Sequence, residues 1–534
     1  MENRKRIVKT VIDIGNRKLK GIIGEMTQDG VLILEQADVI SSGIERSSIT
    51  NTMELSGALG ALIEKLKKAN RLIDKITIGV GGKTVKTKRG EITYEFDKKQ
   101  ITEEDVENFL EKAKKELLTS REVLLHKEIY NIKVDNIKNI KSPVGRIGSH
   151  LQADVYLIYM ERDEYRKYDE VCSKLNLKIE NVLASSYASA LSTLRLQDRK
   201  NGVVLVDIGE SSTDIVIYAY DRLIFLDSIQ VGTMHYINDI TYLPTYVEYK
   251  TRHTTSGEKK TLSKKAARDI FERYHRKEIA LDKAYTRDGL TYMGDYIREI
   301  IDYRNTEVAG LIKELITNSG FAPLGKKITI TGGGANIDGL EEKISQITQK
   351  NTKKILPIKI PGLKTNNTNF ASVIGLFGDA IDKVYQRMMT PQPKEKIEVK
   401  LAPVPPRKSM ETPIENPVEK KGTKDFYPPS NTTTLVKPTP VNSINPIDVR
   451  EVEDPTAKTE PNKGIILVEP TTIKEDPVVP SIDTTDPEDD LKKILEKYKG
   501  IDTANVDNEE DDFKFSKWLK NGIKKVKEWT ENFE

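Results

Sequence analysis

The feature that most constrains the fold of this 534-residue chain is a strand–turn–strand unit that occurs twice. Residues 203–217 read VVLVDIGESSTDIVI, an apolar run that ends at Asp207, a turn at Gly209 and a second apolar run. Residues 8–25, VKTVIDIGNRKLKGIIGE, repeat the pattern with Asp13 and Gly15. One apolar strand that ends in Asp-x-Gly is usually an ordinary turn. Two copies predict two related halves, each of which contributes one turn to a shared ligand.

The chemistry of these turns suits a phosphate group. Backbone N–H groups in a glycine-containing turn point at anionic oxygens, and an aspartate at the end of the strand can organise a hydrated magnesium ion. A third segment, residues 327–340 (KITITGGGANIDGL), is a β-branched strand followed by three glycines and an expected helix. Glycines there let the backbone approach a flat ligand that a Cβ atom would obstruct.

In this order the three segments resemble the phosphate-1, phosphate-2 and adenosine motifs of the actin/sugar-kinase/chaperone ATPase superfamily. Within it, roughly residues 5–385 resemble the bacterial cell-division FtsA family, and three further stretches carry this resemblance: 101–115, 139–158 and 177–194. The resemblance implies an α/β, actin-like, two-lobed ATPase fold with an α+β subdomain inserted in the first lobe. A disordered tail that ends in an amphipathic helix is expected to follow.

The expected domain organisation has six parts. The first lobe comprises 5–83, completed by 167–196 and about 370–388, and it carries the insert 84–166, which reads strand, helix, strand, strand, helix. The second lobe comprises a nucleotide-binding subdomain, 197–245 and 320–369, and a helical subdomain, 246–319. A linker (391–512) and a terminal helix (513–534) follow. The insert is either a structural appendage or, as the resemblance implies, an interaction subdomain for self-association and for later division proteins.

The resemblance also implies roles for individual residues at a site for ATP and Mg²⁺. Asp13 and Asp207 would organise Mg²⁺ through water molecules. The other expected nucleotide contacts are Gly15, Asn16, Lys20, Gly209, Ser212, Gly332, Gly333 and Gly334.

Two departures from the family pattern bear on hydrolysis. The second turn has Glu210 and Ser211 where the family has glycines, which restricts positive-φ conformations. A carboxylate at 210 either faces the phosphates, at a cost of about 3 kcal/mol per pair of like charges at about 5 Å, or points to solvent. The family also commonly has Glu three residues before the lysine at 250, where this chain has Val247. We therefore expect ATP binding with weak or absent ATPase activity.

A locally basic segment lies in the second half. Residues 250–304 contain 14 Lys and Arg against 9 Asp and Glu. Such a run is either a solvated helical face or a surface for an acidic peptide. The resemblance implies that this subdomain binds the acidic C-terminal tail of FtsZ, and Arg304 matches an arginine of that family segment.

The composition changes at Pro391, after which 18 of the 23 prolines lie between residues 391 and 487. This region is expected to be disordered. Within the tail, residues 489–499 are either a peptide motif or a transient helix.

The last 22 residues predict an amphipathic helix. Its apolar arc comprises Phe515, Trp518, Leu519, Ile523, Val526, Trp529 and Phe533. Six lysines against three glutamates give the segment a charge of +3. No folded domain directly precedes the helix for this arc to pack on, which favours a helix that lies in the surface of an anionic membrane.

Bulk properties exclude several classes of function. Lys plus Arg (85) balance Asp plus Glu (82), which argues against a nucleic-acid partner. The one cysteine, Cys172, is expected to be a core residue. No stretch approaches the roughly 18 to 20 apolar residues of a membrane span, so a cytoplasmic protein is expected.

The resemblance implies a peripheral protein on the cytoplasmic side of the membrane at the division site. It would form actin-like filaments, tether FtsZ filaments of the Z ring to anionic lipids and recruit later division proteins. The alternatives are a PilM-like cytoplasmic scaffold of a type IV pilus machine and a sugar kinase or phosphatase of the superfamily.

Overall fold

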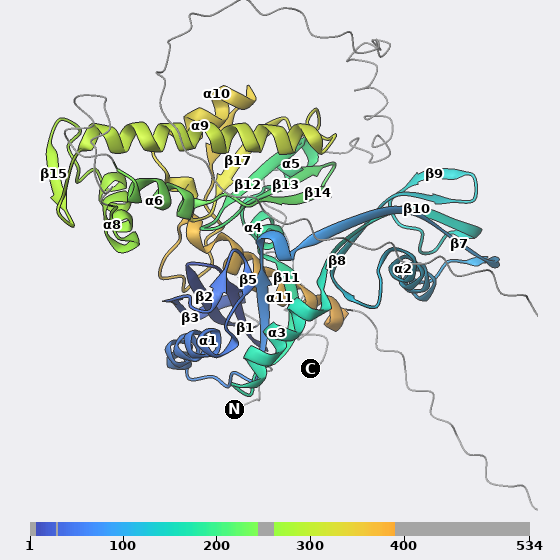
Figure 1. The fold of residues 1–534 in the computed structure, drawn as a ribbon. Coiled ribbons are helices and arrows are strands. Elements are labelled where there is room, and N and C mark those ends of the chain that lie inside the picture. Colours follow the sequence, from blue (N-terminus) through green and yellow to red (C-terminus); the bar gives the residue numbers. More distant parts are fainter. Residues whose placement is uncertain (1–6, 28–29, 244–260, 390–534) are drawn as a thin grey trace, which may run out of the picture. The chain divides into compact units, whose positions relative to one another are not determined.

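The computed structural model describes residues 7–27, 30–243 and 261–389 (Figure 1). All of them belong to one compact unit. Two five-stranded mixed sheets form its framework, and each begins with a three-stranded antiparallel meander that contains one Asp-Ile-Gly turn.

The first sheet has the strand order β11-β6-β1-β2-β3. Its strands are β1 (Ile7–Ile14), β2 (Lys18–Thr27), β3 (Gly30–Ile40), β6 (Lys75–Val80) and β11 (Lys178–Ala184). The second sheet has the order β14-β13-β12-β17-β18. Its strands are β12 (Val203–Ile208), β13 (Thr213–Ala219), β14 (Arg222–Ile229), β17 (Lys327–Thr331) and β18 (Thr352–Lys354). In both sheets a parallel strand pairs with the free side of the first meander strand. The two halves therefore have the same topology, as the repeated sequence unit predicts.

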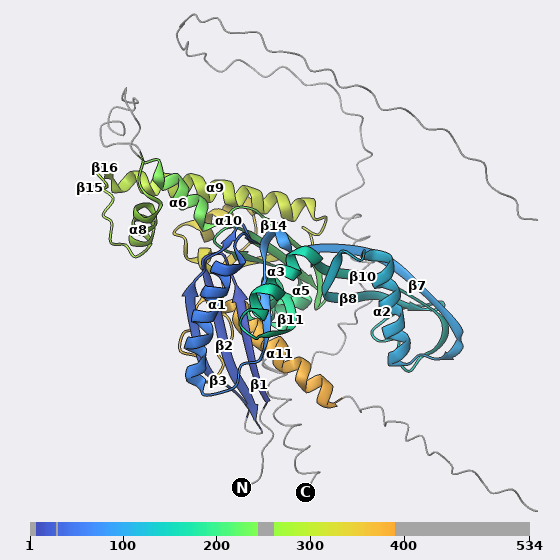
Figure 2. The same ribbon diagram turned by 60° about the horizontal axis from the view of Figure 1, so that its bottom comes forward.

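Helices cover both faces of the first sheet. Gly21 and Gly24 on β2 point to opposite faces, because a Cβ on Gly21 would meet Leu66 of helix α1 (Thr52–Leu66), whereas one on Gly24 would meet Phe377 of α11 (Ala371–Met389). Figure 2 shows α1 and α11 on the two sides of these strands. Helix α1 buries an apolar face that includes Leu55, Leu59 and Leu62, and a short 3-10 turn, η1 (Lys67–Ala69), extends it.

One of the remaining helices of the framework (Arg162–Ser173) packs against α1 and the edge strand β11 of the first sheet, and the others line the junction of the two sheets or cover the second one. These helices are α3 (Arg162–Ser173), α4 (Ser185–Thr193), α5 (Leu196–Asn201), α6 (Thr233–Thr241) and α10 (Leu340–Thr348). Helix α4 contacts strands of both sheets and packs along α11. Its central position follows from its composition, since nearly all of its residues are small and buried. Cys172, on α3, is fully buried, which confirms its expected role in the core.

The insert forms a separate four-stranded antiparallel sheet with its own hydrophobic cluster (Figure 2). It comprises β7 (Lys86–Gln100), α2 (Glu103–Leu117), β8 (Glu122–Val134), β9 (Ile137–Ile140) and β10 (Ile147–Glu161). Helix α2 begins with a capping box between Thr102 and Asp105. The expected number of strands was wrong by one. Asp135 adopts a positive φ of 50° and turns the chain back, so that the short strand β9 pairs with the end of β8.

A mainly helical segment adjoins the second sheet. It contains α8 (Lys264–His275), a hairpin of β15 (Ala284–Arg287) and β16 (Leu290–Met293), and the 25-residue helix α9 (Gly294–Asn318). Figure 1 shows α9 running past the second sheet, and its contacts with β13 and β14 agree with that view. The short elements β4 (Ile44–Glu45), β5 (Ser48–Ile49), η2 (Gly82–Thr84), η3 (Gly333–Asn336) and η4 (Thr368–Phe370) lie in the connections.

Candidate nucleotide site

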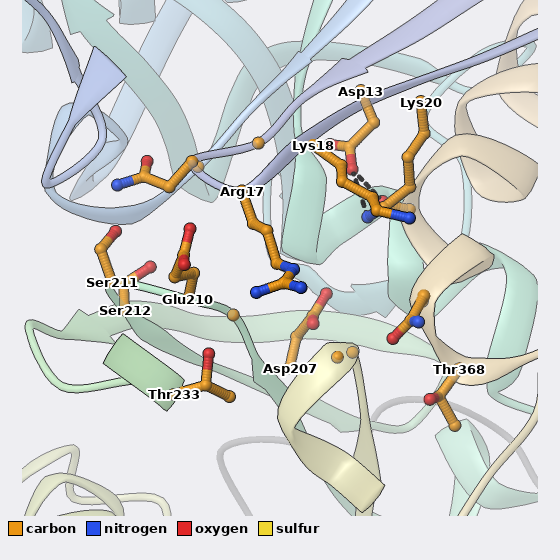
Figure 3. Close-up of a pocket in the computed structure, with 18 of the residues that line it drawn as sticks. Asp13, Arg17, Lys18, Lys20, Asp207, Glu210, Ser211, Ser212, Thr233 and Thr368 are labelled. Carbon is orange, nitrogen blue, oxygen red and sulfur yellow. Dashed lines mark hydrogen bonds and ion pairs between the residues drawn. The ribbon is translucent and has the colours of Figure 1, made fainter. Parts of the chain in front are cut away.

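A cavity of about 610 Å³ lies between the two Asp-Ile-Gly turns (Figure 3). The turn after β1 and the turn after β12 face each other across it, α8 and α6 form one wall, and the glycine-rich segment after β17 forms another. Of the residues that the sequence nominates for the nucleotide, those that line the cavity are Asp13, Gly15, Asn16, Lys20, Asp207, Gly209, Ser212, Gly332 and Gly333.

Both turns are tight enough to need glycine. The Gly209 N–H donates to the Ser212 carbonyl at 2.8 Å, and a Cβ on Gly209 would lie 3.0 Å from that oxygen. A Cβ on Gly15 would lie 2.9 Å from the Lys18 carbonyl oxygen. The side chain of Asn16 is engaged within the protein, because its Oδ1 accepts from the Ser47 N–H at 3.0 Å.

Serine hydroxyls hold the two nominated carboxylates in place. Asp13 accepts from Ser185 at 2.7 Å and from Ser372 at 2.6 Å, while Asp207 accepts from Ser189 at 2.5 Å. The sequence analysis did not identify these serines. They come from α4 and α11, two helices that only the packed fold brings to the ends of β1 and β12.

Asp214 is a third carboxylate of the cavity that the sequence analysis did not assign. It stands opposite Asp207 in the β12–β13 ladder, is 8% exposed and accepts from Ser228 at 2.7 Å. Burial raises the pKa of Asp214 above its ordinary value. Its position directly after the second turn is a signal that sequence alone could have provided.

Two of the three glycines of the glycine-rich segment line the cavity. Gly332 has a φ of +85°, and a Cβ there would lie 2.3 Å from Oδ1 of Asp207, so glycine is required. Gly333 lines the cavity, together with Asn336 of η3. Gly334 instead packs against Ile208 and Thr233, where a Cβ would come within 2.2 Å of the isoleucine side chain.

Three cations in the first half surround the cavity, and only Lys20 was nominated. Lys20 is the ladder partner of Asp13, and its ammonium lies 3.3 Å from that carboxylate. Lys18 pairs with Asp38 at 2.7 Å, and Arg17 extends into the cavity toward Asp207 (Figure 3). Lys20 was nominated through the family resemblance, whereas Arg17 and Lys18 lie in or next to the turn itself.

Of the two orientations expected for Glu210, the structure has the one that faces the site and not the one that points to solvent. Its carboxylate faces the cavity and binds Arg268 of α8 at 2.5 Å, and its side chain is 10% exposed. Burial raises the pKa of Glu210, and the positive charge of Arg17 opposes this rise. Arg268 thus offsets the like-charge repulsion that this glutamate would otherwise impose on a phosphate. Val247 and Lys250 lie outside the described residues.

Arg304, nominated for partner binding, lies on α9 outside the cavity. Its guanidinium makes a two-pronged contact with Asp239 of α6, with both distances 2.7 Å, and it also binds Glu307. Its side chain is 19% exposed. The nominated apolar residues of the last segment, Phe515 to Phe533, lie outside the described residues.

Asp207 supplies a prediction about pH. Burial raises its pKa from 3.8 to about 7, so the folded protein holds this proton to higher pH than the unfolded chain does. The stability gained is complete below about pH 4 and is lost as the pH rises through 7. We expect the unfolding free energy to fall by about 1 to 2 kcal/mol between pH 5 and pH 8, after allowance for partial exposure of the residue.

Asp207→Asn should remove most of this fall. The measurement is urea unfolding in EDTA at several pH values, and the exposed Asp163→Asn is the control. Equal slopes for Asp207→Asn and the unaltered protein would contradict the assignment.

Two sheets of identical topology, with an Asp-Ile-Gly turn from each at one cavity, define the actin-like ATPase fold. A solved structure of a PilM–PilN type IV pilus biogenesis complex shares this fold, with a TM-score of 0.50, 13% identity, and coverage of 70% of this chain and 98% of that chain. A family model described as "SHS2 domain inserted in FTSA" matches residues 82–159, which contain the four-stranded insert.

Two relatives narrow the class of protein to which this chain is similar. The chain is 23% identical over 378 residues to the cell division protein FtsA of Agrobacterium fabrum, covering 68% of this chain and 84% of that protein. It is 24% identical over 382 residues to FtsA of Escherichia coli, covering 68% and 88%. These matches confirm the resemblance: the chain is similar in sequence to FtsA, and its fold is actin-like.

Proposed function

We propose that this chain is an ATP-binding protein of cell division that polymerises and tethers FtsZ filaments to the cytoplasmic face of the membrane, where it recruits later division proteins. The observation that carries the proposal is the FtsA-type insert at residues 82–159 within an actin-like fold. The relatives named cell division protein FtsA also support the proposal, because the match covers most of their own length.

The cavity has the chemistry of a nucleotide site. The two glycine turns, at Gly15 and Gly209, bring backbone to the cavity from both halves, where a phosphate would lie between them. In the described part of the chain, Nη1 of Arg268 and Oδ1 of Asn369 are buried without a hydrogen-bond partner, and both residues line the cavity. A guanidinium N–H suits a phosphate, and an amide oxygen beside Gly333 suits a donor of the nucleoside.

The carboxylates of the same cavity fit Mg²⁺. Asp13, Asp207 and Asp214 supply the oxygen ligands that this ion prefers, directly or through water. The ion would neutralise phosphate charge, and the nearby serines would hold the aspartates in place for it. With Glu210 and Ser211 in the second turn, we propose that turnover is weak or absent.

The partner surface would include Arg304. Because Asp239 and Glu307 already hold its guanidinium, an acidic peptide such as the FtsZ tail would have to replace these carboxylates. The exchange would replace one carboxylate partner of Arg304 by another, so the guanidinium would not be left unpaired.

Membrane attachment would use the expected helix of residues 513–534. Within the described residues no helix is both long and apolar enough to span a bilayer. One amphipathic helix with a charge of +3 is a weak anchor. A filament that carries many copies binds far more tightly through avidity, which makes polymerisation and tethering one function.

The proposal predicts that the full chain with ATP co-sediments with vesicles that contain anionic lipid and brings FtsZ with it. Removal of residues 513–534 should reduce both proteins in the pellet to background. The Arg304→Ala variant should still bind the vesicles, but the amount of FtsZ in the pellet should fall at least 5-fold. Charge-neutral vesicles and Arg166→Ala, an exposed arginine of α3, are the controls.

The outcomes separate this function from the alternatives. A full chain that ignores anionic vesicles even in the presence of ATP would contradict the tether and would favour a cytoplasmic scaffold of the PilM kind. Vesicle binding without recruitment of FtsZ would contradict the partner assignment.

A further inference from the structure

Within the described residues, each cation that lines the cavity contacts a carboxylate. The pairs are Arg17–Glu272 at 2.6 Å, Lys18–Asp38 at 2.7 Å, Lys20–Asp13 at 3.3 Å, Arg268–Glu210 at 2.5 Å and Arg276–Glu278 at 2.5 Å. A paired cation attracts a ligand with several negative charges less than a free one does, so a cation that turned from its carboxylate to the ligand would strengthen binding. The cation that turns most readily to a ligand is the one whose separation from its carboxylate costs the least free energy.

Backbone structure or burial holds three of these pairs together, and a fourth, Arg276–Glu278, joins two residues only two positions apart at the C-terminal end of α8. Lys20 and Asp13 are directly opposite each other in the β1–β2 ladder, and both are largely buried. Lys18 and Asp38 lie on the paired strands β2 and β3. The buried carboxylate of Glu210 would be left unpaired if Arg268 moved, which is costly.

The Arg17–Glu272 pair is different. Arg17 lies in the turn after β1 in the first half, whereas Glu272 lies on α8 in the second half, and no strand pairing connects them. Their side chains are 41% and 40% exposed, so separating them costs little. Figure 3 shows the Arg17 side chain reaching across the cavity toward the second turn, where Glu210 and Asp207 lie.

Glu272 also has another cation available. Nη1 of Arg276, the C-cap residue of α8, lies 4.0 Å from Oε2 of Glu272, while Nε of the same guanidinium binds Glu278 at 2.5 Å. If Arg17 leaves, Glu272 keeps a favourable neighbour on its own helix. The released guanidinium of Arg17 presents a planar fork of donors that matches phosphate oxygens.

We propose that Arg17 is a phosphate-binding residue of the nucleotide site and that Glu272 competes with the phosphates for it. In the absence of nucleotide, Glu272 holds Arg17 and joins the first turn to α8. When phosphates bind, Arg17 turns to them and Glu272 pairs with Arg276. This inference rests on the proposed ATP site and adds to it a residue that binds and a residue that opposes binding.

Substitutions of Arg17 and of Glu272 should change the affinity for ATP in opposite directions. Calorimetric titration of the full-length protein with ATP and Mg²⁺ measures this affinity. Arg17→Ala should weaken ATP binding at least 10-fold and leave adenosine binding within 2-fold. Glu272→Gln should strengthen ATP binding 3- to 10-fold. In the double variant Arg17→Ala/Glu272→Gln, the gain in ATP affinity from Glu272→Gln should disappear, because Arg17 is no longer present for Glu272 and the phosphates to compete for. Glu64→Gln, which changes an exposed charge on α1, is the matched control.

Several outcomes would overturn the inference while the proposed function stands. They are an unaltered affinity in Arg17→Ala, a loss of affinity in Glu272→Gln, or a gain that persists in the double variant. If the unaltered protein binds neither ATP nor ADP, the proposed nucleotide site fails and this inference fails with it. Circular dichroism melts identify any variant that does not fold, and Arg17→Lys, which keeps the charge, then replaces Arg17→Ala with an expected loss of at least 3-fold.

Discussion

Gly375→Ala should destabilise the protein by about 3 kcal/mol or more, because overpacking at a rigid contact forces backbone to move. Gly375 lies on α11, and a Cβ there would lie 1.7 Å from the carbonyl oxygen of Ala188 on α4 and 2.4 Å from the carbonyl carbon. No rotamer change relieves a clash with backbone atoms, so the two helices must separate. A loss of this size is a large fraction of the 5–15 kcal/mol that typically stabilises a domain.

The contact also positions the site. Helix α4 carries Ser185 and Ser189, which bind Asp13 and Asp207, and α11 carries Ser372, which also binds Asp13. Separation of the helices would therefore move the serines away from both aspartates. We expect lower ATP affinity in any Gly375→Ala protein that remains folded.

Urea unfolding measures the effect, and Gly310→Ala on α9 is the matched control. At Gly310 a Cβ meets no atom within 4 Å, so alanine should be neutral or should stabilise by about 0.5 to 1 kcal/mol through its higher helix propensity. A Gly375→Ala protein with the stability of the unaltered chain would refute the close packing of α4 on α11.

Removal of the Arg268 side chain should weaken ATP binding at least 30-fold. Arg268 offsets the charge of Glu210 at 2.5 Å and has an unpartnered Nη1 in the cavity. The alanine variant would lose a phosphate donor and would also leave a largely buried carboxylate unpaired beside the phosphates, which is costly.

The part of this loss of ATP affinity that comes from the unpaired Glu210 carboxylate can be tested separately. Glu210→Gly in the Arg268→Ala background removes the unpaired carboxylate and restores the glycine that the FtsA motif usually has at this position. We expect the double variant to recover affinity to within about 10-fold of the unaltered protein, which is a coupling between neighbours that a double-mutant cycle measures. If Glu210→Gly gives the same factor with and without Arg268, the two side chains act independently and the charge-offset account is wrong.

Much of the fold followed from local pattern. The strand–Asp-Ile-Gly–strand units predicted the two hairpins, because apolar runs broken by a glycine turn have few other solutions, and their repetition predicted the shared topology of the sheets. Thr102, with Asp105 three residues later, is the local pattern of a capping box, and α2 starts there. The extra strand β9 was missed because four residues after a turn carry too little periodicity.

The site was predictable where a residue lies in the turn itself. Asp13, Asp207 and the two turn glycines were identified by sequence and line one cavity. Asp214 directly follows the second turn, and its role could have been read from the same motif.

Only the tertiary structure decided the partners of these residues. Glu210 binds Arg268, which lies 58 residues away, and Arg17 binds Glu272 at a separation of 255 residues. Whether Glu210 faced a phosphate or solvent was open in the sequence because that choice depends on where α8 packs. By itself the sequence determined the hairpins, their turns and the acidic residues at the strand ends, since these depend on neighbours along the chain. The pairing of charges across the cavity depends on packing between distant segments, which no local pattern encodes.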